Sequence, residues 1–171
     1  VIRAIRKCRR PVVAALNGLV AGAGAVIAAA CDFRIASESA KIAFLFTKVG
    51  LSGADMGACW LLPRLVGQAR ATEILMLGDF LDAKEAERIG LYNKVVAPER
   101  VMAEAQALAE RLAKGPSYAL EVTKDALNRE AHMDVFTALE EEANMQAACM
   151  LNPNFREAYE AFKAKREPKF V

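Results

Sequence analysis

A run of small residues between Arg10 and Asp32 constrains the fold of this chain more than any other feature. Within it, Val12–Leu16 has the composition of a short buried strand. Gly24–Cys31 has the composition of a short buried helix whose small side chains allow a neighbouring strand to approach closely. The turn Gly22-Ala-Gly-Ala25 leads into this helix and overlaps its first residues. The run therefore predicts a strand, a tight turn and a closely packed helix.

The start of this predicted helix is a candidate binding site for negative charge. Its first backbone N–H groups have no partner within the helix, and they lie at the positive end of the helix dipole. An oxygen that gains charge during a reaction is one possible occupant. The alternative is that Gly22 and Gly24 only make room for close packing. The turn lacks both the G-x-G-x-x-G pattern and the Gly-Lys-Ser/Thr end of a P-loop, so nucleotide-binding motifs are absent.

The composition is that of a globular protein whose net charge is too small to attract nucleic acid strongly. The 171 residues are 54% apolar, which is enough for one buried core, and the net charge is only +2. We interpret the basic clusters near both ends as solvated helix faces or as the rim of a site for an anionic ligand. No apolar run is long enough for a membrane span. Nucleic acid and membrane are therefore not expected partners.

The cysteines indicate a reducing compartment. They show no CxxC spacing and no histidine partner, and three of the four have apolar neighbours, so we expect reduced and mostly buried thiols. The four are Cys8, Cys31, Cys59 and Cys149. This pattern favours a cytoplasmic protein, or one of the mitochondrial matrix if the source is eukaryotic.

The pattern along the chain changes at Pro98. Before it, short strands alternate with helices; we expect strands at Phe33–Ala36, Lys41–Phe44 and Tyr92–Val96, and helices at Ala58–Val66, Ala69–Leu77 and Ala83–Ile89. Pro63 is expected to bend or break the first of these helices. After Pro98 the pattern is helical throughout, with helices at Glu99–Lys114, Ser117–Arg129 (capped by Ser117), Val135–Met150 and Phe155–Lys165. We therefore predict an α/β region at residues 1–97 and an all-helical region at 98–171, whose apolar stripes pack on the first region or on another subunit.

Asp55 is the candidate for proton transfer. It stands in a loop rich in Gly and small residues and has apolar neighbours, where loss of water would favour the neutral acid and suit proton transfer. It can equally be the N-cap of a helix that starts near Gly57. The only histidine, His132, has no Ser or Cys nucleophile motif beside it, so we expect a surface or cap role. No grouping of ligand side chains predicts a metal site.

Several segments together resemble the enoyl-CoA hydratase/isomerase (crotonase) superfamily, in the family's order and spacing over nearly the whole chain. They are Arg10-Pro-Val-Val-Ala-Ala-Leu-Asn-Gly18, Gly22-Ala-Gly-Ala25, Cys31-Asp-Phe-Arg-Ile-Ala36, Lys48-Val-Gly-Leu51, Leu62-Pro-Arg-Leu-Val-Gly67, Gly78-Asp-Phe-Leu-Asp-Ala-Lys-Glu-Ala86, Gly90-Leu-Tyr-Asn-Lys-Val-Val96 and Ala161-Phe-Lys-Ala-Lys-Arg166. The resemblance implies that residues 1–97 are the C-terminal part of a ββα spiral core and that 98–171 form a trimerisation region. It also implies an acyl-CoA substrate, no separate cofactor, and a homotrimer or a dimer of trimers.

The resemblance assigns roles to individual residues. In the family, two backbone N–H groups hold the thioester oxygen while an enolate forms, and one of them matches Ala23, between Gly22 and Gly24. The two catalytic Glu residues of the family's hydratases match Val26 and Phe46, which cannot activate water. Family isomerases that act on dienoyl-CoA, or on ring-opened or epoxidised aromatic acyl-CoA, use an Asp that matches Asp55. An isomerase is therefore expected; the alternatives are an enoyl-CoA hydratase without the two Glu residues, or a non-catalytic or RNA-associated protein of this fold.

Other positions are expected to contact the substrate. Phe46, Gly53 and Trp60 would line it, and the terminal helix would bring Phe162 and Lys165 to coenzyme A, often in a neighbouring subunit. Family members have further residues before the position of Val1, which hold the other oxyanion N–H group and much of the adenine pocket. We therefore interpret the chain as a fragment of such a protein.

Overall fold

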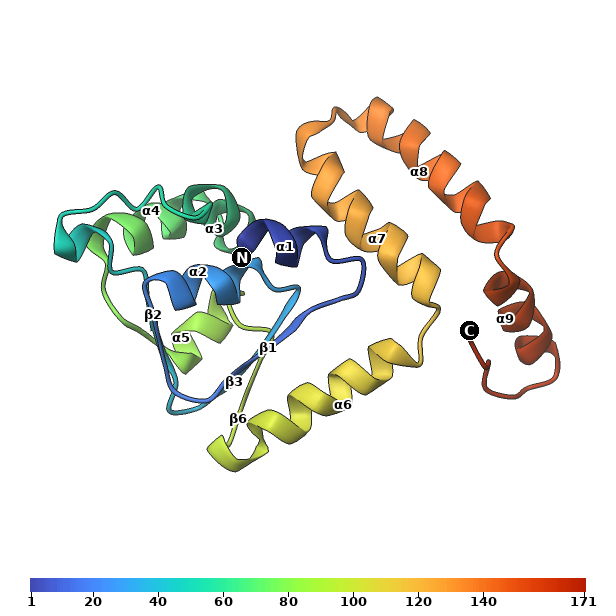
Figure 1. Cartoon of the computed structure of the whole chain (residues 1–171), viewed down its shortest axis with the longest axis horizontal. Helices are drawn as coiled ribbons and strands as arrows, with labels where there is room; N and C mark the ends of the chain where they lie inside the picture. Colours follow the sequence, from blue (N-terminus) through green and yellow to red (C-terminus); the bar gives the residue numbers. More distant parts are fainter. The chain divides into compact units, whose positions relative to one another are not determined.

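The computed structural model describes residues 1–171, which divide into two compact units (Figure 1). The first unit comprises residues 1–8 and 12–108, and the second comprises residues 9–11 and 109–171. The division falls inside helix α6 (Val101–Ala113), because Val101 and Ala105 of its first turns are buried against Ile35 and Val96. None of the helices is both long and apolar enough to cross a lipid bilayer.

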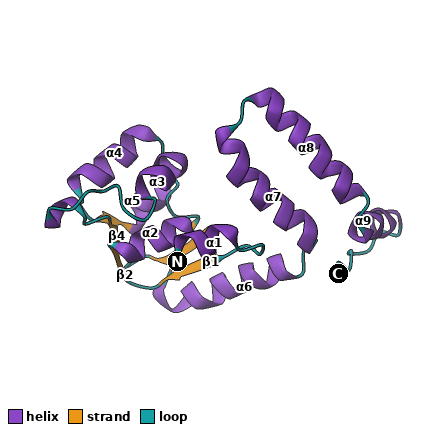
Figure 2. Cartoon of the chain, turned by 45° about the horizontal axis from the view of Figure 1, so that its top comes forward, coloured by secondary structure: helices purple, strands orange, loops and turns teal.

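The first unit contains two small sheets (Figure 2). One is parallel throughout, in the order β1 (Val13–Leu16), β3 (Phe33–Ser37), β6 (Lys94–Val96). The other has the order β2 (Leu19–Ala21), β4 (Lys41–Ala43), β5 (Leu81–Asp82), in which β2 and β4 are parallel and β4 and β5 antiparallel. The predicted strands are confirmed. Strands β2 and β5 were not predicted, because segments of three and two residues are too short to show alternation.

Helices fill the rest of the first unit. They are α1 (Ile2–Lys7), α2 (Ala23–Ala30), the 3₁₀ turn η1 (Thr47–Val49), α3 (Ala58–Val66), α4 (Gln68–Leu77), α5 (Ala83–Arg88) and the 3₁₀ turn η2 (Pro98–Arg100). The predicted helices are confirmed, but Pro63 does not break α3, which continues to Val66. Proline removes the N–H that would bond to the carbonyl of Cys59. Cys59 is exposed, so water can bind that carbonyl instead.

Helix α2 is the most closely packed element of the first unit. It contacts α1, α3 and β2, and Ala25, Val26 and Ala30 have no exposed surface. These residues belong to the main buried cluster of the first unit, which also contains the larger side chains of Phe44 and Leu62. Small residues on α2 therefore let the helix lie close to its neighbours, as the sequence predicts.

The second unit is all helical. Beyond the end of α6 it contains α7 (Ser117–Arg129), the 3₁₀ turn η3 (Glu130–His132), α8 (Val135–Met150) and α9 (Pro153–Lys163). The predicted helices are confirmed, but Ser117 is the first residue of α7 and not its cap, which is Pro116. The Ser117 hydroxyl donates instead to the Val171 carbonyl (3.4 Å).

The cysteine prediction is wrong in part. No disulfide forms, but Cys31 alone is buried, while Cys8 and Cys59 are exposed and Cys149 is half-buried. Apolar neighbours in sequence do not bury Cys59, because α3 is amphipathic and this residue lies on its outer face.

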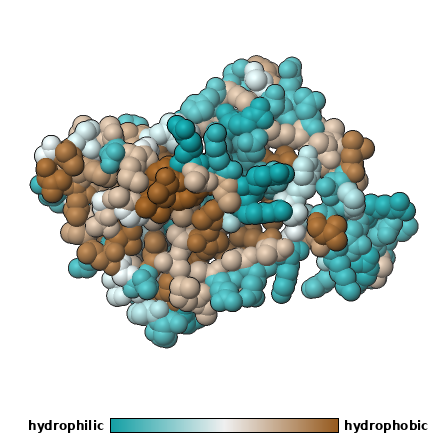
Figure 3. All heavy atoms as spheres, in the orientation of Figure 1, coloured by the Kyte–Doolittle hydropathy of each residue, from teal (hydrophilic) through white to brown (hydrophobic).

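Large apolar side chains remain at the surface of both units (Figure 3). In the second unit, Phe155, Tyr159 and Phe162 follow one another at helical spacing along α9 and are all exposed. Phe136 and Leu139 are exposed on α8. These residues form the exposed apolar surface of the second unit.

The last residues fold back onto α9. The Arg166 guanidinium donates to both carboxylate oxygens of Glu157 (2.6 and 3.0 Å), and the Lys169 N–H donates to Glu157 as well (2.7 Å). The buried Asn154 amide donates to the Val171 carbonyl (2.9 Å) and accepts from its N–H (3.0 Å). The hydrogen bonds from Arg166, and then from Lys169, lower the pKa of Glu157 to about 2.

We predict that attachment of this tail depends on pH. A carboxyl with a lowered folded-state pKa stabilises the attached form above its ordinary pKa, and this contribution is lost as pH falls toward about 2. Hydrogen exchange at the Lys169 amide should therefore show protection that decreases between about pH 4.5 and 2, relative to intrinsic rates. In Glu157→Gln this pH dependence should disappear. Equal pH dependence in both proteins would contradict the assignment.

Candidate active site

The start of α2 presents two backbone donors. Gly22 is the N-cap, and its carbonyl accepts from the N–H groups of Ala25 (3.0 Å) and Val26 (3.3 Å). The N–H groups of Ala23 and Gly24 have no hydrogen-bond partner in the chain, and both residues are exposed. No side chain caps the helix. These two donors and the helix dipole make the position a candidate site for negative charge.

The shape of the turn requires glycine at Gly22. Its backbone angles are φ 54° and ψ −124°, a conformation that residues with a β-carbon rarely adopt. The Gly22 N–H is fixed by the carbonyl of Ala43 at the end of β4 (3.0 Å). Strand β4 and the N-cap thus hold the beginning of α2 in place.

The interior beneath the helix start is apolar. Val26 has no exposed surface, and Phe46 is 8% exposed. Both belong to the main buried cluster of the first unit. The two positions that the family resemblance assigns to catalytic Glu residues therefore hold packed hydrocarbon side chains, and neither can bind or deprotonate a water molecule.

The loop before α3 carries Asp55 at the surface. Its carbonyl accepts from the Ala58 N–H (2.9 Å), and the two residues between them have positive φ, 50° at Met56 and 89° at Gly57. Positive φ at both central residues is the mark of a type I′ turn. A positive φ at the non-glycine residue Met56 is uncommon and points to a constrained local backbone. The partly buried Met56 packs against the core, and Asp55 is exposed.

Two expectations for Asp55 are therefore wrong. The cap of α3 is Gly57, no side chain caps the helix, and the Asp55 carboxylate forms no hydrogen bond or ion pair. Its surroundings in this chain are not apolar, since the turn directs Met56, and not Asp55, toward the core. The carboxylate is thus open to solvent and to a ligand.

Gly53 brings the same loop close to α4. A β-carbon at this position would lie 3.2 Å from the Leu75 carbonyl oxygen and 3.3 Å from its Cβ. Beside it is a cavity of about 350 Å³ between the loop, α3 and α4, whose lining includes Gly53, Ala54, Cys59, Pro63, Leu75 and Met76. The glycine therefore permits the close approach of loop and helix next to Asp55.

Trp60 of α3 interacts with two cations. The Arg64 guanidinium lies 4.1 Å from the ring centroid and that of Arg6 lies 6.0 Å from it, within the range of cation–π attraction. The ring also packs against the main cluster. Its predicted contact with substrate remains a prediction.

The other predicted residues lie in the second unit. Phe162 is 83% exposed on α9. Lys165 is exposed just after that helix, with φ 52°, where its N–H donates to the Phe162 carbonyl (3.1 Å). His132 is exposed in η3. No group of three or more His, Cys, Asp and Glu side chains is arranged to hold a metal ion.

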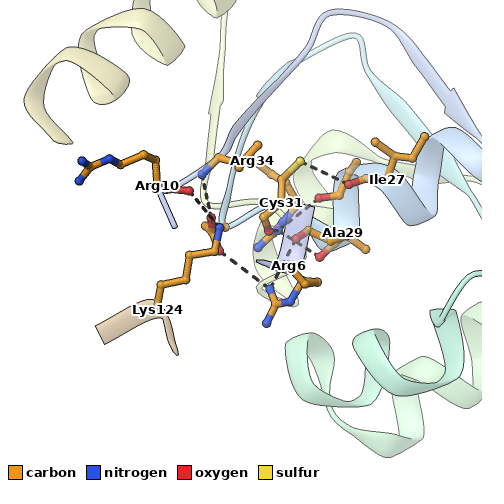
Figure 4. Close-up of polar contacts among 11 residues, drawn as sticks. Arg6, Arg10, Ile27, Ala29, Cys31, Arg34 and Lys124 are labelled. Atoms are coloured by element: carbon orange, nitrogen blue, oxygen red, sulfur yellow. Dashed lines mark hydrogen bonds and ion pairs between the residues drawn. The ribbon is translucent and has the colours of Figure 1, made fainter. Parts of the chain in front are cut away.

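Sequence reasoning missed the role of Arg34. This arginine is only 3% exposed in β3, and its guanidinium donates to main-chain carbonyls at the end of α2 (Figure 4) and to the Leu91 carbonyl after α5. Burial lowers the pKa of this guanidinium. Near it, the buried Tyr92 hydroxyl has no hydrogen-bond partner, and burial raises its pKa to about 12. The sequence did contain one signal for this role, which is a charged residue inside an otherwise apolar predicted strand.

Comparison with known proteins gives consistent results. The sequence model of the family described as enoyl-CoA hydratase/isomerase matches residues 1–171. The 1,2-epoxyphenylacetyl-CoA isomerase of Escherichia coli (strain K12) is 39% identical over 99% of this chain and 64% of its own length. The crotonyl-CoA hydratase of Syntrophomonas wolfei is 36% identical over 100% of this chain and 65% of its own length.

A solved structure confirms the predicted fold. The crystal structure of a protein assigned as an enoyl-CoA hydratase, from Streptomyces coelicolor A3(2), has a TM-score of 0.97 and 50% identity. The match covers 99% of this chain and 62% of that one. The chain thus spans slightly less than two thirds of the proteins that it matches.

We predict that Gly22→Ala destabilises the protein. A side chain at this φ and ψ costs about 1–3 kcal/mol, which urea unfolding would measure as a lower free energy of unfolding. Gly18→Ala is the matched control, because the φ of Gly18 lies outside the positive range and a β-carbon there would meet open space. We expect a change within about 0.5 kcal/mol there. An equal loss in both variants would contradict the assigned turn geometry.

Proposed function

Because the chain belongs to the enoyl-CoA hydratase/isomerase family, we propose that it forms part of an acyl-CoA enzyme that stabilises a thioester enolate. The observation that carries the proposal is the pair of unpartnered N–H groups at Ala23 and Gly24, at the start of an eight-residue buried helix. A thioester oxygen that accepts from Ala23 gains negative charge as a neighbouring C–H bond breaks. Donors already fixed in place stabilise that charge without reorganising.

Asp55 is the proposed acid and base. Its exposed carboxylate removes a proton from the acyl chain, α or γ to the carbonyl, and the bonding electrons move into the enolate. The enolate then collapses and takes the proton back at the other carbon, which moves the double bond. No hydrogen bond or ion pair within the chain occupies this carboxylate, so it is available to accept a proton as a base. The coenzyme A thioester is the substrate, and the cycle requires no separate cofactor.

The apolar residues Val26 and Phe46 favour isomerisation over hydration. Adding water across a double bond requires groups that hold and deprotonate a water molecule. Val26 and Phe46 are packed in the core and offer no such group. Hydration by another route is the second candidate, since one similar protein is named an isomerase and another a hydratase.

An RNA-associated role receives less support. Several basic residues near the two ends are already paired with carboxylates, Arg6 with Asp32, Arg9 with Glu121, and Arg166 with Glu157. Paired cations contribute less to the binding of nucleic-acid phosphates. The pairing therefore favours a structural use of these residues.

The exposed apolar surface of the second unit supports assembly into a homotrimer or a dimer of trimers. Monomeric proteins rarely leave large contiguous apolar patches exposed. Phe162 and Lys165 lie on or next to this surface, so a contact with coenzyme A bound to a neighbouring subunit stays part of the proposal. A cytoplasmic location also stays a prediction.

The reaction type can be tested by offering the protein enoyl-CoA thioesters in parallel assays. We predict that double-bond migration, followed by product analysis, is at least about a hundredfold faster than water addition to crotonyl-CoA, the effect expected of a missing water-activating group. Water addition at an equal or higher rate would contradict the isomerase assignment and favour the second candidate.

Asp55→Asn should lower kcat for isomerisation by about 10² to 10⁴, because the amide cannot accept the proton. Acyl-CoA binding, measured by calorimetry, should be retained. Asp79→Asn is the matched control, since Asp79 is an exposed carboxylate of the same unit that pairs with Lys48; its kcat should stay near that of the unchanged protein. Unchanged turnover in Asp55→Asn would remove Asp55 from the mechanism.

A further inference from the structure

We propose that Arg34 is a positioning residue, which fixes the oxyanion-binding end of α2 by holding the opposite end of that helix. This inference rests on the proposed function. Arg34 lies in β3, is only 3% exposed and faces no carboxylate at ion-pair distance. A buried guanidinium is costly unless its donors are used, so the carbonyls that it binds define its role.

Those carbonyls are mostly the last ones of α2 (Figure 4). Nη1 of Arg34 donates to the carbonyl oxygen of Cys31 (2.5 Å) and lies 3.3 Å from that of Ala28 and 3.5 Å from that of Ala29. The remaining carbonyls at this end are also bound. Arg6 donates to Ala30 (3.5 Å), and the backbone N–H and the thiol of Cys31 both donate to Ile27 (3.3 Å each).

Helix α2 depends on these external donors. Its eight residues are Gly, Ala, Val and Ile only, so none of its own side chains can hydrogen-bond to its final carbonyls. Ala28, Ala29 and Ala30 are buried, where an unbound carbonyl would be costly. The arginine also places positive charge at the negative end of the helix dipole.

Arg34 connects this helix end to the central strand of the parallel sheet. Its Nε donates to the Leu91 carbonyl (2.6 Å), while its backbone N–H donates to the Asn93 side chain (2.8 Å) and its carbonyl accepts from the Asn93 N–H (3.0 Å). Strand β3 pairs with both β1 and β6. The end of α2 is thereby tied through β3 to β1 and to the segment of Leu91, Asn93 and β6, which lies about sixty residues further along the chain.

The bonds made by Arg34 at the C-terminal end of α2 also affect the position of its N-terminal end. An eight-residue helix is about 12 Å long, so a tilt at the C-terminal end displaces the N–H groups of Ala23 and Gly24. Misplacement of a catalytic donor by about 1 Å costs up to about a hundredfold in rate. Arg34 therefore affects the developing charge through α2 and does not contact the substrate.

The test measures how strongly the site polarises a bound thioester. Crotonyl-CoA and phenylacetyl-CoA labelled with ¹³C at the carbonyl are bound to the protein, and the infrared carbonyl stretch is compared with that in water, beside kcat and KM for isomerisation. The variants are Arg34→Met, which removes the hydrogen-bond donors, and Arg34→Lys, which keeps the positive charge but loses the planar guanidinium that binds several carbonyls at once. Val101→Ala is the control, because Val101 is fully buried against Ile35 and Val96 and not against α2, so its truncation lowers the stability of the protein without removing a contact to that helix.

In the unchanged protein the carbonyl stretch should shift to lower frequency. Arg34→Met should lose most of this shift and about tenfold to a hundredfold in kcat, with KM within about twofold. Arg34→Lys should recover part of both, and it provides the measurement if Arg34→Met fails to fold. Val101→Ala should melt at a lower temperature and keep the full shift.

Two outcomes separate the inference from the proposed function. A shift in the unchanged protein that persists in both Arg34 variants would overturn the positioning role and leave the oxyanion proposal standing. Absence of a shift with both labelled thioesters in the unchanged protein would overturn the oxyanion proposal, and the role of Arg34 with it. Loss of the shift in Val101→Ala would also overturn the positioning role, since general destabilisation would then explain the effect.

Discussion

The close packing of α2 is the constraint on which the rest of the first unit depends. A helix made of Gly, Ala, Val and Ile can lie close to its neighbours, but it has no polar side chain to satisfy its own ends. The buried C-terminal carbonyls are therefore bound by Arg34, Arg6 and Cys31, whereas the N–H groups of Ala23 and Gly24 stay exposed. Because the helix carries no polar side chain, its backbone N–H groups at Ala23 and Gly24 are the donors that it offers at its exposed end.

This division of roles agrees with a protein that holds charge without activating water. Val26 and Phe46 pack in the core beside the helix start, so the carboxylates needed to handle water are absent from these positions. The carboxylate of Asp55 is held in a separate loop, where a turn with positive φ at Met56 and Gly57 directs it to the surface. We thus propose that proton transfer and charge stabilisation belong to different elements of one unit.

The sequence alone predicted the helices and strands that are long enough to show a hydrophobic periodicity. The strand at residues 12–16 and the helix at residues 24–31 were correct, although the strand β2 between them was not predicted, and the long helices of the second unit were correct as well. It could not predict that Met56 takes the partly buried place beside Asp55, because the positive φ of this non-glycine residue leaves no signal in the sequence. Arg34 was missed for a related reason. Its partners are carbonyls of other elements, which carry no side-chain signature in the sequence.

The most direct test of the central claim is a crystal structure of the protein with a bound acyl-CoA thioester. The account predicts that the thioester oxygen lies about 2.7–3.1 Å from the Ala23 nitrogen, in line with the axis of α2. A well-ordered thioester whose oxygen is bound elsewhere, with the start of α2 occupied only by solvent, would contradict it.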